Sequence, residues 1–401
     1  MSGEELCEAW FVTIILNMLP IDKNGEAVKR FVLGFVLMAG AASALAQDGF
    51  IFQPLAAGEK PANGITRDTH ASTVVELRDG DVMAAWFGGT AEGANDVVIH
   101  GARLHNGVWG PVVELAKADG VATWNPVLFH TKDGKLWLYY KYGTKPTTWK
   151  GRRKWSTDEG KTWSAEEDLP EGILGPIRAK PLILDDGTIV SGSSVENGKW
   201  NAWIERSTDN GKTWTKFGPI TVPEALDIPD AGAIAASQQV DKPVPGETIH
   251  TKLYPPAKET TGIIQPVVVP MGGHHLRFFA RSHTKAQRIA IADSMDDGKT
   301  WTQARFIDVP NPSAGIDIVR LKDGRYVLIY NNSYNTRTPI NLAVSTDGEH
   351  FRMFKVLEDT PGQFSYPALV QAKNGDLLMT YSYQRKTIKF VRLPLAEVPA
   401  K

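Results

Sequence analysis

The octet STDEGKTW, residues 156–163, occurs again as STDNGKTW from Ser207 and as SMDDGKTW from Ser294. A shorter relative, STDGEHF, begins at Ser345. The aspartate stands third in every copy, and successive aspartates are 51, 87 and 51 residues apart. Repetition with a period of about 50 residues is typical of a fold assembled from similar units.

A second pattern runs out of phase with the octets: an apolar stretch, a turn that contains glycine, and another apolar stretch. Its glycines are 54, 53, 86, 51 and 51 residues apart. β-prone residues on both sides of an Asp-Gly or Asn-Gly pair predict a β-hairpin, because these turn residues adopt positive φ at little cost. The six copies read STVVELRDGDVMAAWF, NPVLFHTKDGKLWLYY, AKPLILDDGTIVSGSS, QPVVVPMGGHHLRFFA, IDIVRLKDGRYVLIYN and YPALVQAKNGDLLMTY.

Six hairpin units predict an all-β fold with radial sheets around an axis, a six-bladed β-propeller over residues 47–401. The long gap places about 35 extra residues in a Pro-rich insertion at 221–261. After the sixth hairpin, TIKFVRLPL supplies a third strand, and Gly49–Leu55 is expected to pair beside it and complete the last blade. A β-sandwich or a solenoid is the alternative architecture.

The octets are expected at the turn that follows an apolar strand, on the outer part of each blade. Their aspartate can accept backbone N–H bonds, their glycine takes an unusual φ, and their Trp or Phe packs into the blade. A single active site does not need four copies of one motif. The octet is therefore interpreted as a structural element.

The N-terminal residues 1–46 are interpreted as an upstream segment followed by a signal peptide that is removed. Lys29 and Arg30 precede the apolar run FVLGFVLMAGAASA, and Ala44-Leu45-Ala46 supplies small residues before Gln47. The run is shorter than the ~20 residues that a membrane-spanning helix needs, which argues against the alternative of an anchor. The predicted mature chain is periplasmic or secreted, with no stable membrane insertion, and is expected to be a monomer. It lacks the only cysteine, Cys7, so it can form no disulfide.

The overall charge and the histidine spacing exclude several classes of partner. A net charge of −1 without a long basic run argues against nucleic acid. The adjacent His274 and His275 fall in a turn, where neighbouring side chains diverge, so no metal site is predicted. No cofactor is expected either. A serine hydrolase is disfavoured because the sequence has no Gly-x-Ser-x-Gly elbow.

The chemistry is expected around the axis, where the innermost strands begin. Arginines there are unusual for a β-core, and several converging ones would bind a carboxylate or phosphate through charge-assisted hydrogen bonds. For any one of them, a surface salt bridge is the alternative. The candidates are His70, Asp96, Trp124, Asn125, Arg178, Lys180, Gln265, Arg281, Asp317, Arg337 and Tyr366.

The octet resembles the Asp-box, or BNR repeat, of the sialidase superfamily, and the resemblance covers nearly all of the predicted mature chain. It implies that Arg281 and Arg337 match the second and third arginines of the carboxylate-binding triad. Tyr366 in FSYPAL resembles the tyrosine nucleophile, and Asp96 resembles the acid/base carboxylate. The implied ligand is an oligosaccharide or polysaccharide with an acidic sugar, with Arg178, Lys180, Asn125 and Asp317 as further substrate-binding residues.

Two positions depart from the sialidase pattern. The first triad arginine normally lies in an Arg-Ile-Pro motif, and the matching strand here reads HAST, with His70. The glutamate that activates the tyrosine is replaced by Gln265. A tyrosine with a pKa near 10 is a poor nucleophile without a base, and nothing in the sequence places Glu205 or Asp317 in that role.

Three functions therefore compete. The first is a sialidase-like exo-glycosidase that works in two retaining steps through Tyr366. The second is a polysaccharide lyase, or an unusual hydrolase of the rhamnosidase type, for uronate-containing glycans, with His70 and Tyr366 as the proton-transfer pair. The third is a carbohydrate-binding propeller without turnover. A core histidine is the alternative interpretation of His70.

Overall fold

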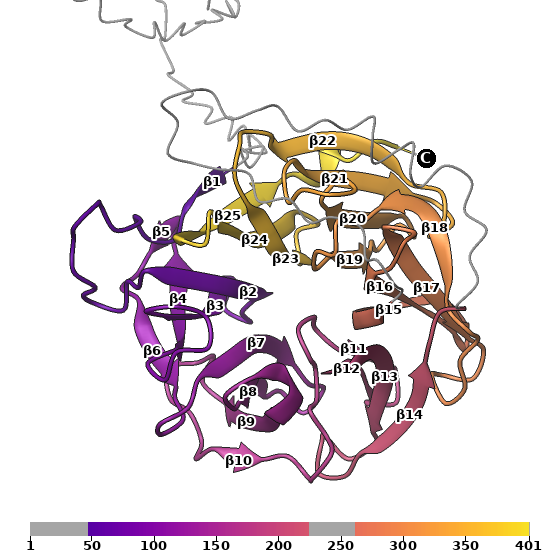
Figure 1. Ribbon diagram of the computed structural model, residues 1–401, viewed down its shortest axis with the longest axis horizontal. Helices are drawn as coiled ribbons and strands as arrows, with labels where there is room; N and C mark the ends of the chain where they lie inside the picture. The colour runs from indigo at the N-terminus through magenta and orange to yellow at the C-terminus, as the bar shows by residue number, and fades with distance from the viewer. Residues whose placement is uncertain (1–46, 224–260, 401) are drawn as a thin grey trace, which may run out of the picture. The chain divides into compact units, whose positions relative to one another are not determined.

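The described part of the computed structural model, residues 47–223 and 261–400, consists of β-strands joined by turns (Figure 1). Its helical content is limited to two short 3-10 helices, η1 (Pro146–Thr148) and η2 (Leu395–Glu397). The prediction of an all-β fold is confirmed. The predicted signal peptide, and residues 224–260 of the predicted insertion, lie outside the described residues.

The first two sheets follow one another along the chain. The first contains β2 (Asp68–Glu76), β3 (Val82–Gly89), β4 (Val98–His105), β5 (Val108–Trp109) and β6 (Val113–Ala116). The second contains β7 (Thr123–His130), β8 (Leu136–Tyr142), β9 (Lys150–Ser156) and β10 (Glu167–Asp168).

The third sheet has eight strands, of which the first four and the last four are joined at one point. Trp200 of β13 pairs in parallel with Gly262 of β15. Its strands are β11 (Leu182–Ile183), β12 (Ile189–Asn197), β13 (Lys199–Ser207), β14 (Thr215–Ile220), β15 (Gly262–Gly272), β16 (His275–His283), β17 (Arg288–Ser294) and β18 (Arg305–Pro310).

The last two sheets contain the C-terminal strands and β1. The fourth consists of β19 (Asp317–Arg320), β20 (Tyr326–Tyr330), β21 (Ile340–Ser345) and β22 (Arg352–Glu358). The fifth consists of β23 (Phe364–Gln371), β24 (Leu377–Tyr383), β25 (Thr387–Leu393) and β1 (Gln47–Phe50).

All six predicted hairpins form as antiparallel pairs: β2–β3, β7–β8, β11–β12, β15–β16, β19–β20 and β23–β24. In Figure 1 the first strands of these hairpins surround the middle of the view, and the later strands of each sheet lie toward the periphery. The start of each first strand is therefore a place where side chains from different sheets can meet.

The predicted pairing of an N-terminal segment with the last sheet is confirmed, but the strand is Gln47–Phe50 and not Gly49–Leu55. β1 pairs antiparallel with β25, from Gln47 opposite Arg392 to Phe50 opposite Lys389. Ile51 and Phe52, which follow β1, are buried in an apolar cluster that contains residues of β2–β4 and of β23–β25. The first and last sheets thus share a core.

The octets occupy the turns predicted for them, after β9, β13, β17 and β21. The first three copies have the same hydrogen bonds, and in the fourth His350 takes the place of the threonine at the aspartate. In the copy from Ser207, the serine hydroxyl donates to Asp209 and accepts from the backbone N–H of Gly211. Asp209 in turn accepts the N–H and hydroxyl of Thr213, at 2.9 and 2.6 Å. Although burial raises the pKa of Asp209, these hydrogen bonds from Thr213 and Ser207 outweigh it and lower that pKa to about 2.

Candidate active site

β-Bulges interrupt four of the innermost strands at matching places. Ala71, Asn125, Gln265 and Tyr366 have φ values of 55°, 39°, 57° and 54°. At each of them the register with the next strand of the sheet shifts. A bulge of this kind re-aims a side chain and is common beside active sites. A left-handed backbone is costly for a residue with a side chain, so each position must be held by its surroundings.

Tyr366 lies at the centre of the predicted site residues. Its Oη accepts a hydrogen bond of 2.8 Å from Arg281 Nη1 and one of 3.3 Å from Gln265 Nε2. In the described part of the chain, no carboxylate oxygen is hydrogen-bonded to this Oη. The glutamine therefore occupies the place where a base would contact the phenol, and an amide cannot accept the phenolic proton.

Two arginines approach the same ring from the third and fourth sheets. The Arg281 guanidinium, at the end of β16, lies 5.9 Å from the Tyr366 ring and 4.9 Å from the ring of Trp200. The Arg337 guanidinium lies 5.7 Å from the Tyr366 ring. Arg281 donates to the Ser313 hydroxyl, and Arg337 donates to the Ser313 carbonyl at 3.0 Å. The two guanidinium groups are thus anchored to one residue.

His70 is buried against the tyrosine. Its ring centroid is 4.2 Å from that of Tyr366, and its Nδ1 lies 2.9 Å from the Ser382 hydroxyl. Burial holds the pKa of His70 well below its usual range, and the positive charges of Arg385 and Arg337 lower it further. The imidazole is therefore neutral at pH 7 and has one nitrogen that can accept a proton.

Arg178 and Asn125 lie deeper in the molecule. Arg178 is 3% exposed, and its guanidinium lies 5.6 Å from the Tyr366 ring. It donates to the backbone carbonyls of Pro367, at 2.8 Å, and Ile316. Asn125 Nδ2 donates to the carbonyl of the residue before Arg178 at 3.2 Å. Both side chains contact backbone.

Lys180 and Asp317 form an ion pair of 2.9 Å in which the aspartate is 2% exposed. The other oxygen of Asp317 accepts the N–H of Leu369 at 2.8 Å. Glu205 is fully buried and accepts the backbone N–H of Gly175. Asp317 and Glu205 are thus engaged away from the phenol oxygen, and neither replaces the missing base.

Asp96 lies in an exposed loop beside the first sheet. Both of its carboxylate oxygens accept hydrogen bonds from the N–H of Thr90, and one also accepts the Thr90 hydroxyl. The side-chain hydrogen bond from Thr90 lowers the pKa of Asp96 against the opposing effect of burial. The structure thus joins His70, Gln265, Arg281, Arg337 and Arg178 around Tyr366, and shows no contact between Asp96 and that group.

Sequence reasoning missed Glu196 and Trp200, which lie at the turn between β12 and β13. Burial raises the pKa of the half-buried Glu196, while the charge of Arg281 opposes the rise. The Arg281 guanidinium packs over the indole ring of Trp200. The sequence held a signal for Glu196, because it lies near the end of the second strand of its hairpin, as Arg281 does in the next hairpin.

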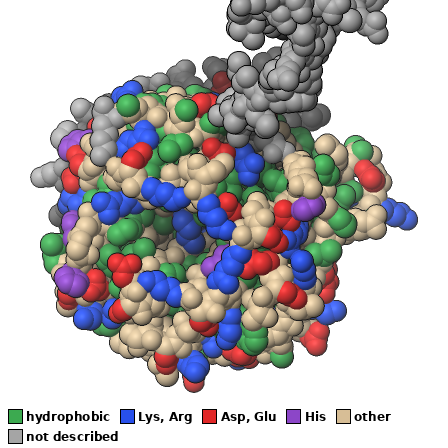
Figure 2. Space-filling view, turned by 180° about the vertical axis from the view of Figure 1, so that it is seen from behind, with side chains coloured by type: hydrophobic (Ala, Val, Ile, Leu, Met, Phe, Trp, Pro, Cys, Tyr) green, Lys and Arg blue, Asp and Glu red, His purple; other side chains and the backbone are tan. Residues whose placement is uncertain are grey.

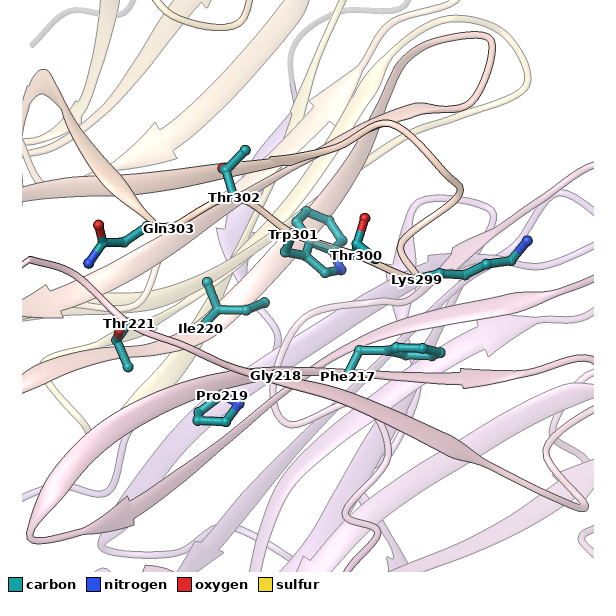
Figure 3. Close-up of a pocket in the computed structure, with 10 residues that line it drawn as sticks. All are labelled: Phe217, Gly218, Pro219, Ile220, Thr221, Lys299, Thr300, Trp301, Thr302 and Gln303. Atoms are coloured by element: carbon teal, nitrogen blue, oxygen red, sulfur yellow. The ribbon is translucent and has the colours of Figure 1, made fainter.

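Basic side chains gather around a hollow near the middle of one face in Figure 2. A separate groove of about 430 Å³ is lined by Phe217–Thr221 and Lys299–Gln303 (Figure 3). It lies between β14 and the third octet and contains none of the predicted site residues. The chemistry proposed below therefore does not involve this groove.

The described residues contain no group of three or more His, Cys, Asp and Glu side chains that could hold a metal ion. They also contain no helix long and apolar enough to cross a membrane.

Several solved structures have a similar fold. A protein of unknown function from Dyadobacter fermentans superposes with a TM-score of 0.64 at 18% identity, covering 87% of this chain and 99% of its own. The NanB sialidase from Streptococcus pneumoniae gives 0.62 at 12% identity, with coverage of 86% and 71%. The intramolecular trans-sialidase from Ruminococcus gnavus gives 0.58 at 14%, with coverage of 84% and 96%.

A family model described as a BNR repeat-like domain matches residues 80–379, which include all four octets and most of the site. The chain belongs to this family, and its all-β fold is that of the sialidases.

Proposed function

We propose that this protein is a sialidase-like exo-glycosidase that acts on a terminal acidic sugar of a glycan. The observation that carries the proposal is the pair of guanidinium groups at one tyrosine. Arg281 donates to Tyr366 Oη, and Arg337 lies 5.7 Å from the same ring. Two arginines in a partly desolvated site bind a carboxylate strongly. A neutral sugar offers these guanidinium groups no negative charge to pair with.

In the proposed reaction, Tyr366 Oη attacks the anomeric carbon while the bond to the leaving oxygen breaks. Asp96 gives its proton to that oxygen, and the phenolic proton passes to the neutral His70 beside the ring. Water then attacks the glycosyl-tyrosine, Asp96 takes a proton from the water, and the phenol regains its own. Because Thr90 stabilises the ionised form of Asp96, the first step requires substrate to displace Thr90 from this carboxyl group.

A second candidate is a lyase for uronate-containing glycans, and the absence of a carboxylate base at Tyr366 Oη favours it. Here the arginines neutralise the uronate carboxylate and so acidify the adjacent carbon. The neutral His70 removes the proton from that carbon, and the Tyr366 phenol donates a proton to the departing oxygen. The product carries a new C=C bond.

Product analysis separates the two reactions. Purified enzyme is incubated with a panel of sialosides and uronate oligosaccharides, and with a fluorosugar that traps a glycosyl-enzyme. A trapped label on Tyr366 with release of a saturated sugar supports the glycosidase. An unlabelled enzyme that releases an ultraviolet-absorbing product identifies the lyase. Binding of acidic sugars without any product would leave a carbohydrate-binding protein.

The remaining parts of the proposal concern architecture and location. We propose six blades, and the single residue pair that joins the two halves of the eight-stranded sheet supports dividing that sheet into two. The shared core of the first and last sheets supports an arrangement around an axis. We also propose a periplasmic or secreted monomer, processed before Gln47, in which Asn125 lines the sugar-binding region.

A further inference from the structure

Each of the six innermost strands, or the segment just before it, has one matching position. In five of the six it lies nine residues before the glycine of the hairpin turn. These five are Ala71, Asn125, Arg178, Gly315 and Tyr366. Gln265, eight residues before Gly273, is the sixth. Four of the six carry a left-handed bulge.

The Arg178 side chain reaches across to the fourth and fifth sheets past Gly315. A Cβ added at Gly315 would lie 3.3 Å from Arg178 Nε, which is tighter than most Cβ contacts, and 3.5 Å from its Cζ, which is an ordinary van der Waals distance. Glycine thus leaves room for the guanidinium. Arg178 can then donate to Pro367, in the fifth sheet, and to Ile316, just before β19.

Pro367 immediately follows Tyr366, and β23 is the edge strand of its sheet. The backbone carbonyl and N–H groups on the free edge of β23 have no neighbouring strand to bind. Arg178 binds the carbonyl of Pro367, and Asp317, held by Lys180, binds the N–H of Leu369. Side chains from other sheets therefore satisfy the backbone that follows Tyr366, whose φ is 54°.

We propose that Arg178, Asp317 and Lys180 are positioning residues that hold the Tyr366 bulge in its left-handed conformation and keep its phenol at Arg281. They act through the tyrosine and not by touching the sugar. The inference rests on the proposed function only in taking Tyr366 as the reacting residue. A displacement of about 1 Å at a reacting group can cost about 100-fold in rate.

The experiment compares Arg178→Met and Gly315→Ala with Arg277→Met. The control arginine is also buried and also donates to a backbone carbonyl of another sheet, that of Gly348, but lies at the fourth octet. We expect Arg178→Met to lower kcat about 10- to 100-fold, with the affinity for an acidic sugar, measured by calorimetry, changed less than threefold. Arg178→Lys should recover part of the rate. Arg277→Met should lower the melting temperature and leave kcat unchanged.

A second readout does not depend on turnover. In protein labelled with 3-fluorotyrosine, the 19F resonance of Tyr366 is identified by its loss in Tyr366→Phe. It should shift in Arg178→Met and Gly315→Ala and stay in place in Arg277→Met. If Arg178→Met lowers sugar affinity with kcat and the 19F resonance unchanged, Arg178 binds substrate and the positioning role is wrong. If the resonance shifts as expected but the wild type turns over no acidic glycan, the positioning inference stands and the proposed function fails. Gly315→Ala, the milder change, keeps the test available if Arg178→Met does not fold.

Discussion

Tyr366 shows how a single residue combines strain and chemistry. A non-glycine residue at positive φ costs of the order of 1–3 kcal/mol, and contacts with the surroundings must offset this strain. For Tyr366 these contacts are hydrogen bonds to its phenol and to the backbone that follows it. The same contacts place the Oη at Arg281 and the ring beside Arg337 and the neutral His70.

Replacing Arg281 or Arg337 by alanine should weaken binding of an acidic sugar far more than binding of its neutral counterpart. We expect a loss of about 2–5 kcal/mol for the acidic ligand, because a charge pair in a desolvated site is broken. Calorimetry with a sugar acid and its amide or alcohol analogue measures the difference. Equal losses for charged and neutral ligands would show that these arginines support only the fold.

Gln265→Glu should place a carboxylate about 3.3 Å from the phenol oxygen, where the wild type has an amide. If Tyr366 is a nucleophile, the added base should raise the rate of glycoside cleavage by about 100-fold, since general bases typically contribute at least that much. Gln265→Leu is the control, because it fills a similar volume without a base. A glutamate variant that hydrolyses no faster than wild type would argue against nucleophilic attack by Tyr366 and favour elimination.

The residues around Tyr366 could be proposed from the sequence because most lie near the start of an inner strand, and Arg281 and Arg337 matched the sialidase pattern. Their mutual contacts could not, because the bulges decide where the side chains point. One signal for the bulges was present: Asn125, Gln265 and Tyr366 each precede a proline. The Arg178 side chain reaches the other sheets past Gly315, which has no side chain. This contact joins residues far apart in the sequence, so no local pattern predicts it.

At the scale of the element, the octets do more than close their own turns. Arg103 of β4 donates to the carbonyl of Glu159 in the first octet, and Arg153 of β9 donates to that of Gly211 in the second. Arg277 of β16 makes the same bond to Gly348 in the fourth. In each case an arginine of one sheet binds the octet of the next, so the motif also joins neighbouring sheets.

Asp209→Ala should therefore lower stability and leave the chemistry unchanged. Removing an acceptor of backbone and hydroxyl hydrogen bonds typically costs about 1–3 kcal/mol. A pKa of about 2 in the folded protein lies below the ordinary value of ~3.9, so this contribution is fully present above about pH 4 and is lost as the pH falls toward 2. Denaturant melts of both proteins at pH 7 and near pH 2.5 should show the difference shrinking in acid. An equal melting curve at pH 7 with lost activity would overturn the structural interpretation of the octet.

At the scale of the whole molecule, the hairpin pattern predicted all six innermost pairs and the strand that closes the last sheet. It succeeded because β-prone runs on both sides of an Asp-Gly or Asn-Gly turn are local signals. The joining of β13 to β15 into one eight-stranded sheet was not predicted, since it depends on one parallel pair across the predicted insertion. Packing between sheets, which brings β2 against β23, is likewise non-local.

Because β1 completes the last sheet, the position of the predicted cleavage site affects the stability of the folded protein. β1 begins at Gln47, the first residue expected to remain after processing, and its last residue, Phe50, pairs with Lys389. A chain that starts at Gln47 keeps this strand, whereas one that starts at Gln53 loses it together with the buried Ile51 and Phe52. Burying each of these apolar side chains contributes about 1.5–3 kcal/mol, so the shorter chain should lose several kcal/mol and expose one edge of β25.

The comparison requires the two chains expressed without any preceding segment, with unfolding followed by calorimetry and fluorescence. The longer chain should unfold in one transition at the higher temperature. The shorter one should melt lower and aggregate through the exposed strand edge. Adding a synthetic peptide of residues 47–55 should restore part of the difference, because the strand and its two buried side chains can bind where they belong in the intact chain. Identical melting of the two chains would show that the last sheet is stable with three strands and that β1 contributes little to the fold.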